Sequence, residues 1–234
     1  MEKTCPKILV MFSGGSDSTM AAFLAAQQAS TVYMLTLRRF GLFGMERSQV
    51  NYERLCARFP ETRFVRLFDR FDKEYREVAY HDWIKDLARF GFVTASMCGI
   101  CKLGMHWKTI QICKEHDIHV VYDGAAHATR KFPEQNKVIF LNSLTKLYEE
   151  NGILYDTPVY DLDTQRGLYE AKLTPGLRVK GTSKDIQPTC SQQILFASLA
   201  SLYLSRYTFE EYEQKLKPLF DKKIDFMRGR LSNA

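Results

Sequence analysis

The sequence has no apolar run long enough to cross a membrane. Its longest strongly apolar stretch, residues 193–204, is interrupted by Ser198, Ser201 and Tyr203. It is shorter than the roughly 20 residues that a bilayer span needs. The first residues lead into an apolar segment at Lys7 without the hydrophobic core of a signal peptide. We therefore expect a cytoplasmic protein that does not enter a membrane.

Low-complexity segments, internal repeats and dense blocks of one charge are also lacking. The net charge of +6 is spread along the chain, which suits either a polyanionic partner, such as a nucleotide or RNA, or an ordinary basic protein. The 234 residues are 45% hydrophobic, which is enough for one sizeable core. Composition thus indicates a globular domain and leaves its partner open.

Short apolar runs alternate with helical patterns along the first two thirds of the chain. Five strands are predicted, at residues 7–12, 31–37, 62–67, 118–124 and 152–159. The helices predicted between them cover residues 17–28, 48–59, 73–90 and 101–116. Continuous apolar strands separated by helices are typical of an α/β fold with a parallel sheet. The third strand alternates in polarity, so we place it near an edge of the sheet.

The last part of the chain reads as two helices, at residues 191–206 and 209–228. No linker separates them from what precedes. We expect residues 1–190 to form the catalytic domain and residues 191–234 to form a helical extension of that same domain.

The segment Ser13-Gly14-Gly15-Ser16-Asp17-Ser18 stands where the first strand passes into the first helix. Glycines let a backbone approach an anion closely, serine hydroxyls add donors, and a helix N-terminus attracts phosphate. The segment is neither a Walker loop nor a dinucleotide fingerprint, because neither spacing is present. A capped turn with no ligand is the alternative.

Residues Val10–Thr19 resemble the PP-loop of the ATP pyrophosphatase superfamily. The resemblance implies a Rossmann-like (HUP-type) five-stranded sheet, cleavage of ATP to AMP and pyrophosphate, and an adenylated substrate. It also implies that Ser13, Gly14, Gly15, Ser16, Asp17 and Ser18 hold the pyrophosphate, with Asp17 near Mg²⁺ and with Asp17 and Ser18 in catalytic roles.

The resemblance continues more weakly further along. The segment Tyr122–His127 matches a glycine-containing strand end that faces the nucleotide in these enzymes, so Gly124 and His127 are candidate nucleotide contacts. The paired aspartates of the thiolation enzymes are missing there. The segment Asp156–Val159 resembles a later proline-containing element, but its arginine is missing.

Three cysteines form a candidate metal site. Cys98 and Cys101 make a Cys-x-x-Cys pair, expected just before a helix, and Cys190 precedes another helix. Such a pair can bind zinc or an iron–sulfur cluster, or act as a redox pair. A zinc site would need a fourth ligand, for which His106 and His127 are candidates.

The cysteine order resembles that of three-cysteine tRNA 2-thiocytidine and 2-thiouridine synthetases. That resemblance implies a [4Fe-4S] cluster on Cys98, Cys101 and Cys190. If Cys190 is not a ligand, it could instead be a sulfur-carrying nucleophile. Cys56 and Cys113 lie in predicted helices, where we expect small apolar fillers.

Two functions follow from these patterns. The first is adenylation followed by sulfur transfer to a tRNA base or another nucleobase, with a separate sulfur donor and a homodimer as one oligomeric state. The alternative is an ATP-dependent amide or amidine ligase that uses ammonia and a structural Zn²⁺, like 7-cyano-7-deazaguanine synthase. A non-catalytic nucleotide-binding module of the universal-stress type is disfavoured by the serine-rich loop.

Overall fold

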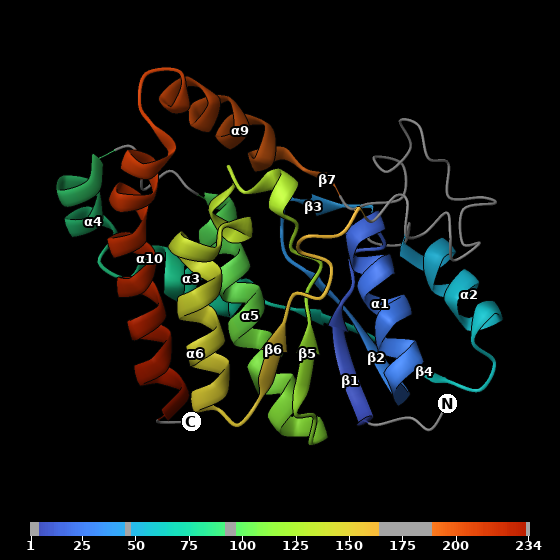
Figure 1. Cartoon of the computed structure of the whole chain (residues 1–234). Helices are drawn as coiled ribbons and strands as arrows, with labels where there is room; N and C mark the ends of the chain where they lie inside the picture. The colour runs from blue at the N-terminus through green and yellow to red at the C-terminus, as the bar shows by residue number, and fades with distance from the viewer. Residues whose placement is uncertain (1–4, 45–47, 92–96, 164–188, 233–234) are drawn as a thin grey trace. The chain divides into compact units, whose positions relative to one another are not determined.

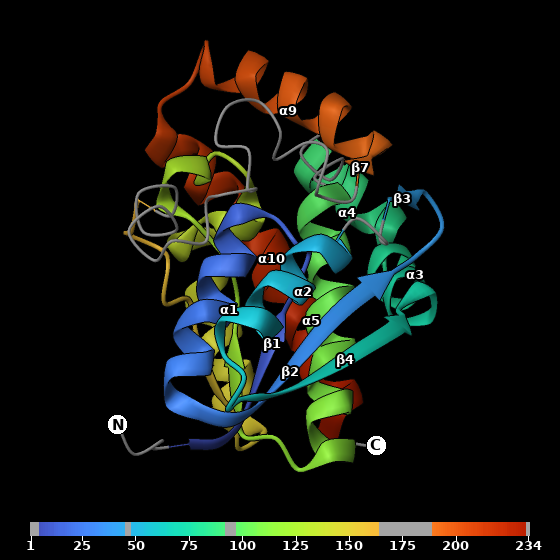
Figure 2. The ribbon, with the colours of Figure 1, turned by 90° about the vertical axis from the view of Figure 1, so that its right-hand side faces the viewer.

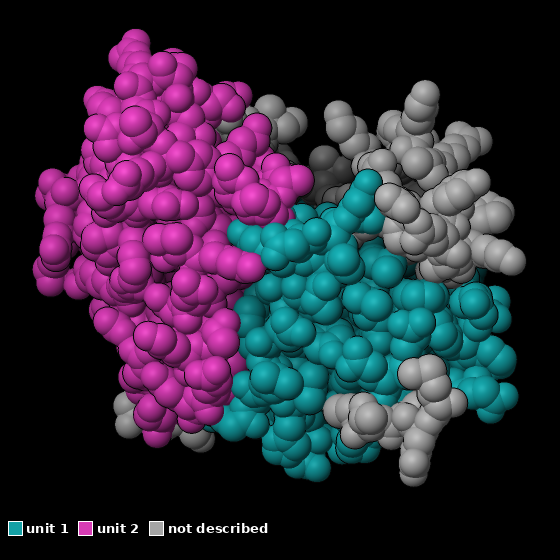
Figure 3. All heavy atoms as spheres, in the orientation of Figure 1, with its two compact units in different colours: residues 1–70, 112–126, 152–189 teal, residues 71–111, 127–151, 190–234 magenta. Residues whose placement is uncertain are grey.

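The computed structural model describes residues 5–44, 48–91, 97–163 and 189–232. The chain divides into two compact units built from interleaved segments (Figure 3). Unit 1 comprises residues 1–70, 112–126 and 152–189, and unit 2 comprises residues 71–111, 127–151 and 190–234. The last of these boundaries falls next to the expected start of the helical extension, but unit 2 also takes in two earlier segments.

Unit 1 contains a five-stranded, wholly parallel sheet with the order β4-β2-β1-β5-β6 (Figure 1). Its strands are β1 (Cys5–Met11), β2 (Ala29–Arg38), β4 (Arg63–Arg70), β5 (Val120–Tyr122) and β6 (Leu154–Asp156). The predicted α/β fold, with a parallel five-stranded sheet and helices, is confirmed. The strand β4 lies at an edge, as its alternating pattern indicated. Two further strands, β3 (Leu42–Phe43) and β7 (Thr189–Cys190), have only two residues each.

The helices α1 (Ser16–Gln28) and α2 (Gln49–Arg58) pack on one face of this sheet (Figure 2). Alanines of α1, such as Ala22 and Ala25, are fully buried and let the helix lie close to the strands. Apolar side chains of β1 and β2 on this face, including Val10 and Met34, complete the core. This packing fixes the position of α1, and so of its N-terminus next to the loop, relative to the sheet.

Unit 2 is helical. Its longer helices are α3 (Asp72–Tyr80), α4 (Trp83–Phe90), α6 (Asn142–Glu150), α9 (Ser191–Leu204) and α10 (Phe209–Ser232). Most of α5 (Met97–His116) also belongs to it, whereas residues 112–116 of that helix belong to unit 1. Three short helical turns, η3 (His127–Thr129), η4 (Pro133–Gln135) and η5 (Lys137–Leu141), precede α6. The two predicted C-terminal helices are present, and the second continues to Ser232.

The single helix predicted over residues 73–90 is wrong, because the chain breaks between α3 and α4. Asp82 adopts a left-handed conformation with φ of 53°. Aspartate tolerates this conformation better than most residues, and its carboxylate is paired with Lys85 and Lys222. The polar contacts of Asp82 thus stabilise the break between α3 and α4, which the helical periodicity of the sequence does not reveal.

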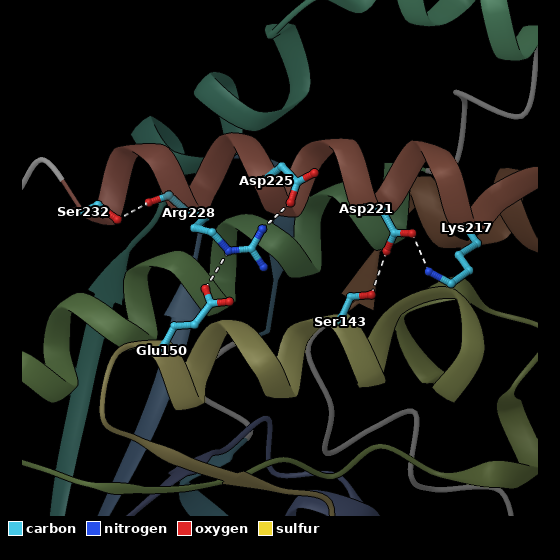
Figure 4. Close-up of polar contacts among 7 residues, drawn as sticks. All are labelled: Ser143, Glu150, Lys217, Asp221, Asp225, Arg228 and Ser232. Carbon is cyan, nitrogen blue, oxygen red and sulfur yellow. Dashed lines mark hydrogen bonds and ion pairs between the residues drawn. The ribbon is translucent and has the colours of Figure 1, made fainter.

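The helices α6 and α10 lie side by side and are joined by polar contacts as well as by a core (Figure 4). The Ser143 hydroxyl donates to Asp221 Oδ1 at 2.7 Å, and Arg228 Nε lies 2.6 Å from Glu150 Oε2. Leu219 and Phe220 of α10 are fully buried. Among the described residues, no helix is both long and apolar enough to span a membrane.

Candidate phosphate-binding site

The loop Ser13–Ser18 lies at the carboxyl end of the central strand β1. The chain runs from β1 outward to β2 and β4, and then returns to place β5 on the opposite side of β1. The gap between β1 and β5 is therefore the point where the strand order reverses. Open α/β sheets bind their ligands at such a switch point, outside the carboxyl ends of the strands.

The loop has a tight and internally bonded conformation. Gly14 has φ of 84°, a region that favours glycine, and Gly15 is the N-cap of α1. The hydroxyls of Ser13 and Ser18 lie 3.0 Å apart, and the Gly15 N–H points to Ser13 Oγ at 3.3 Å. The loop therefore gathers two hydroxyls and a backbone amide next to the start of a helix.

The beginning of α1 gives this cluster a positive electrostatic character. The first intrahelical bond is from Thr19 N to Gly15 O, at 2.9 Å, so the amides of the preceding turn have no partner within the helix. Those amides and the helix dipole favour an anion. Asp17 stands in this first turn and is half-buried, where its carboxylate could help to hold a cation bound to that anion.

Gly124, predicted as a nucleotide contact, packs against the backbone of this turn. A Cβ atom built on Gly124 would lie 2.7 Å from Ser18 N and 2.9 Å from Asp17 C. Any side chain there would push the end of β5 away from the start of α1. The neighbouring Asp123 is buried, and its carboxylate accepts a hydrogen bond from the Tyr155 hydroxyl at 3.0 Å. The structure thus brings the two predicted glycine segments together.

Sequence reasoning missed a third contributor, the helix α2. The Asn51 side chain is 1% exposed, and its Nδ2 donates to Gly14 O at 2.7 Å. Asn51 Oδ1 in turn accepts a hydrogen bond from Arg54 Nη1 at 3.1 Å. A polar residue one turn before the buried Leu55 was the available signal, because an asparagine on the inner face of a helix needs a partner.

A positively charged side chain, Arg66, lies in unit 1 on the face of the sheet that α2 covers. Arg66 of β4 packs over the rings of Phe12 and Tyr52 and donates to Ser48 Oγ. Burial lowers the pKa of Arg66 to about 10, which still leaves it charged at neutral pH. Within the described ranges its Nε and Nη1 atoms have no hydrogen-bond partner. Phe12 immediately precedes the loop in the sequence.

His127, the other predicted nucleotide contact, belongs to unit 2 and not to the unit that holds the loop. It starts the short turn η3, is exposed, and its Nε2 lies 2.5 Å from Arg130 Nη1. His106, considered as a zinc ligand, is fully buried in unit 2, and its Nδ1 lies 2.9 Å from the Tyr148 hydroxyl. That contact explains His106 as part of the core.

The cysteine pair lies inside a helix and not before it, which corrects the prediction. The helix α5 begins at Met97, so Cys98 and Cys101 share its first turn. Residues three apart lie on the same face of a helix, which suits two ligands of one metal. Cys98 is half-buried and Cys101 is buried. Cys190 ends β7, but its side chain lies outside the described atoms.

Of the other cysteines whose side chains are described, Cys113 is buried, as expected of a filler, whereas Cys56 is half-buried and hydrogen-bonded to Tyr52. Cys56 and Cys113 lie in α2 and α5, and burial raises the pKa of Cys113 to about 12, so its thiol stays protonated. In the part of the chain whose side chains are described, no three His, Cys, Asp or Glu residues gather as a metal site.

Comparisons with known proteins find similarity among solved structures. No protein-family model matches the chain, and no curated protein matches its sequence. The fold is similar to the crystal structure of a predicted subunit of tRNA methyltransferase from Methanocaldococcus jannaschii, with 16% sequence identity and a TM-score of 0.44. That match covers 72% of this chain and 76% of the other.

Proposed function

We propose that this chain is an ATP-dependent enzyme that adenylates its substrate and releases pyrophosphate. The observation that supports this most is the loop Ser13–Ser18 at the switch point of the sheet, with Gly124 packed against its backbone. The absence of a side chain at Gly124 lets the segment after β5 lie directly against the first turn of α1. Amides and hydroxyls of the loop are therefore grouped at the carboxyl ends of the central strands, where a polyphosphate is expected to bind.

The proposed chemistry follows from which groups the loop supplies. An oxygen of the substrate attacks the α-phosphorus of ATP, the bond from that phosphorus to the bridging oxygen breaks, and pyrophosphate leaves with the electron pair. The hydroxyls of Ser13 and Ser18 and the amides at the start of α1 would bind the leaving pyrophosphate and stabilise its growing charge. Mg²⁺, bound with ATP, would neutralise the phosphates, and Asp17 would help to hold it.

The second half of the proposal is sulfur transfer to a nucleobase, with tRNA as the proposed carrier of that base. Sulfide attacks the activated carbon, the bond from that carbon to the adenylated oxygen breaks, and AMP leaves with that oxygen and the electron pair. The support is the cysteine pair in one turn of α5, together with the net charge of +6, which suits a polyanionic substrate. Cys98, Cys101 and Cys190 would hold the [4Fe-4S] cluster. When bound, such a cluster can supply an open iron that binds sulfide.

Nucleotide binding is tested by equilibrium dialysis of ATP, with and without Mg²⁺, and by identifying the products formed with bulk tRNA. We expect AMP and pyrophosphate as products. Ser18→Ala should weaken ATP binding about tenfold, the effect of losing one hydrogen bond to a charged group. Asp17→Asn should weaken binding only when Mg²⁺ is present.

Ser30→Ala is the matched control for Ser18→Ala. Ser30 lies in the same unit, and its hydroxyl donates to Pro6 O at an exposed position, so ATP binding should not change. Absence of ATP binding by the wild-type protein, or equal binding by the two serine variants, would refute the proposal.

The metal is tested by anaerobic purification with iron, zinc and sulfide analysis. We expect iron and sulfide with absorption at roughly 400 nm, lost on changing Cys98, Cys101 or Cys190 to Ala and kept in Cys113→Ala. A colourless, zinc-containing protein would favour the ammonia-dependent ligase. Loss of metal from the Cys98 and Cys101 variants alone would leave Cys190 as a candidate sulfur-carrying nucleophile.

A further inference from the structure

We infer that Asn51 is a positioning residue that fixes the orientation of the Gly14–Gly15 peptide, so that its N–H and not its C=O faces the bound phosphate. The inference rests on the proposed function, because it assigns a role within the same phosphate site. It concerns a residue of α2 that lies 37 positions from Gly14 in the sequence.

The first step is the geometry of the peptide itself. In a trans peptide the C=O and the following N–H point in opposite directions. The Gly14 carbonyl is bonded to Asn51 Nδ2 at 2.7 Å, and the Gly15 N–H of the same peptide points to Ser13 Oγ at 3.3 Å. Ser13 Oγ also lies 3.0 Å from Ser18 Oγ. The N–H therefore faces the Ser13 hydroxyl, which itself contacts the Ser18 hydroxyl.

The second step is that this peptide needs an external restraint. It joins two glycines, and Gly14 has φ of 84°, so no Cβ atom opposes rotation of the peptide plane. A flipped peptide would direct the carbonyl oxygen, with its partial negative charge, toward the phosphate. Such a peptide would repel the anion that the other groups attract.

The third step is that Asn51 has the contacts required of a restraint. Its side chain is 1% exposed, so water does not compete for the hydrogen bond to Gly14. Its Oδ1 accepts from Arg54 Nη1 at 3.1 Å. Because a guanidinium only donates, this contact identifies the atom facing Arg54 as oxygen and leaves the Asn51 NH₂ group facing the Gly14 carbonyl.

The decisive variant is Asn51→Asp. It has nearly the same shape and keeps a partner for Arg54, but a carboxylate accepts hydrogen bonds and does not donate them. It should therefore repel the Gly14 carbonyl and favour the flipped peptide. Binding of ATP with Mg²⁺, and of pyrophosphate with Mg²⁺, should weaken about a hundredfold, whereas Asn51→Ala should weaken both about tenfold.

Two measurements separate positioning from a general loss of structure. The thermal unfolding midpoint of Asn51→Asp should stay within a few degrees of the wild type. In protein labelled with ¹⁵N-glycine, which has 13 glycine residues, pyrophosphate should shift the Gly15 amide signal of the wild type and leave it unshifted in Asn51→Asp. Gln49→Glu is the control for charge, since it adds the same charge at an exposed position of α2 and should bind as the wild type does.

The outcomes distinguish this inference from the proposed function. If the wild type binds ATP and pyrophosphate but Asn51→Asp and Asn51→Ala bind them equally well, Asn51 has no positioning role and the proposed function stands. If the wild type binds neither, both fail. If Asn51→Asp does not fold, the Asn51→Ala protein decides the question by the same titrations, and unchanged affinity would overturn the inference.

Discussion

Unit 1 contains the loop Ser13–Ser18, and unit 2 contains a charge cluster made of Asp82, Asp86, Lys222 and Lys223. Both include polar groups, but these groups have different kinds of partner. Within the loop the described bonds join neutral hydroxyl, amide and carbonyl groups, and Asn51 donates to the Gly14 carbonyl. In unit 2, Asp86 and Lys223 are 2% and 1% exposed and form an ion pair of 2.7 Å. Lys222 also approaches Asp86, at 2.5 Å.

This difference teaches how to tell a binding site from a structural contact. Oppositely charged groups that are paired with each other have little left to offer a ligand, whereas neutral donors beside a helix start can still accept an anion. The Asp86 cluster therefore connects helices α4 and α10, whereas the loop keeps donors that suit an anion. The predictions below test that distinction, from the largest expected effect to the smallest.

Replacing Asp86 with Ala should cost about 3–5 kcal/mol of unfolding free energy, because it leaves Lys223 buried without its counter-charge. The affinity for ATP should not change. Urea denaturation and ATP dialysis measure the two quantities. As a control, Lys85→Ala removes an exposed partner of Asp82 and should have little effect on stability. A similarly small loss in Asp86→Ala would mean that the cluster does not stabilise unit 2.

Replacing Gly124 with Ala should disturb the loop of unit 1. The new methyl group would meet the backbone of Ser18, and such overpacking costs about 1–3 kcal/mol. Unlike Asp86→Ala, this change should also weaken ATP binding, at least tenfold, because it displaces the first turn of α1. Gly229→Ala is the matched control, since nothing lies within 4 Å of the added Cβ. Unchanged ATP affinity in Gly124→Ala would contradict the proposed site.

Lowering the pH should weaken the Asp86 cluster. Burial alone would raise the pKa of Asp86, but hydrogen bonds from Lys222 and Lys223 outweigh it and hold the pKa below its ordinary value of 3.8. A lowered folded-state pKa contributes stability above the unfolded value, and this contribution is lost as the pH falls through the folded value. The difference in unfolding midpoint between wild type and Asp86→Asn should therefore be constant above about pH 5 and shrink below pH 3.8. A difference that grew on acidification would contradict this.

The smallest effect is expected at the surface of unit 2. Glu150 is paired with Arg228 across α6 and α10, but both side chains are more than one third exposed (Figure 4). Exposed ion pairs contribute roughly 0.2–1 kcal/mol, and salt screens them. Glu150→Ala should therefore lower stability by less than 1 kcal/mol, with the difference vanishing in high salt. A loss as large as that of Asp86→Ala would show that exposure does not separate the two kinds of contact.

The parallel sheet, its five strands and the place of the loop could all be predicted from local sequence patterns. These features are local, since an apolar run such as residues 7–12 and the serine-glycine segment after it are each readable within a few residues. The position of β4 at an edge also followed from its own alternating pattern. Local patterns predict such elements because backbone geometry and burial repeat with a fixed period.

Only the tertiary structure decided which distant residues meet at the loop and where the helices break. The bond from Asn51 to Gly14, the close approach of Gly124 to Ser18, and the pairing of Asp82 with Lys222 each join segments far apart in the chain. No periodic pattern encodes such pairs, because they depend on how the packed elements are oriented in space. For the same reason, the contact between Asn51 of α2 and Gly14 could not be predicted from the sequence.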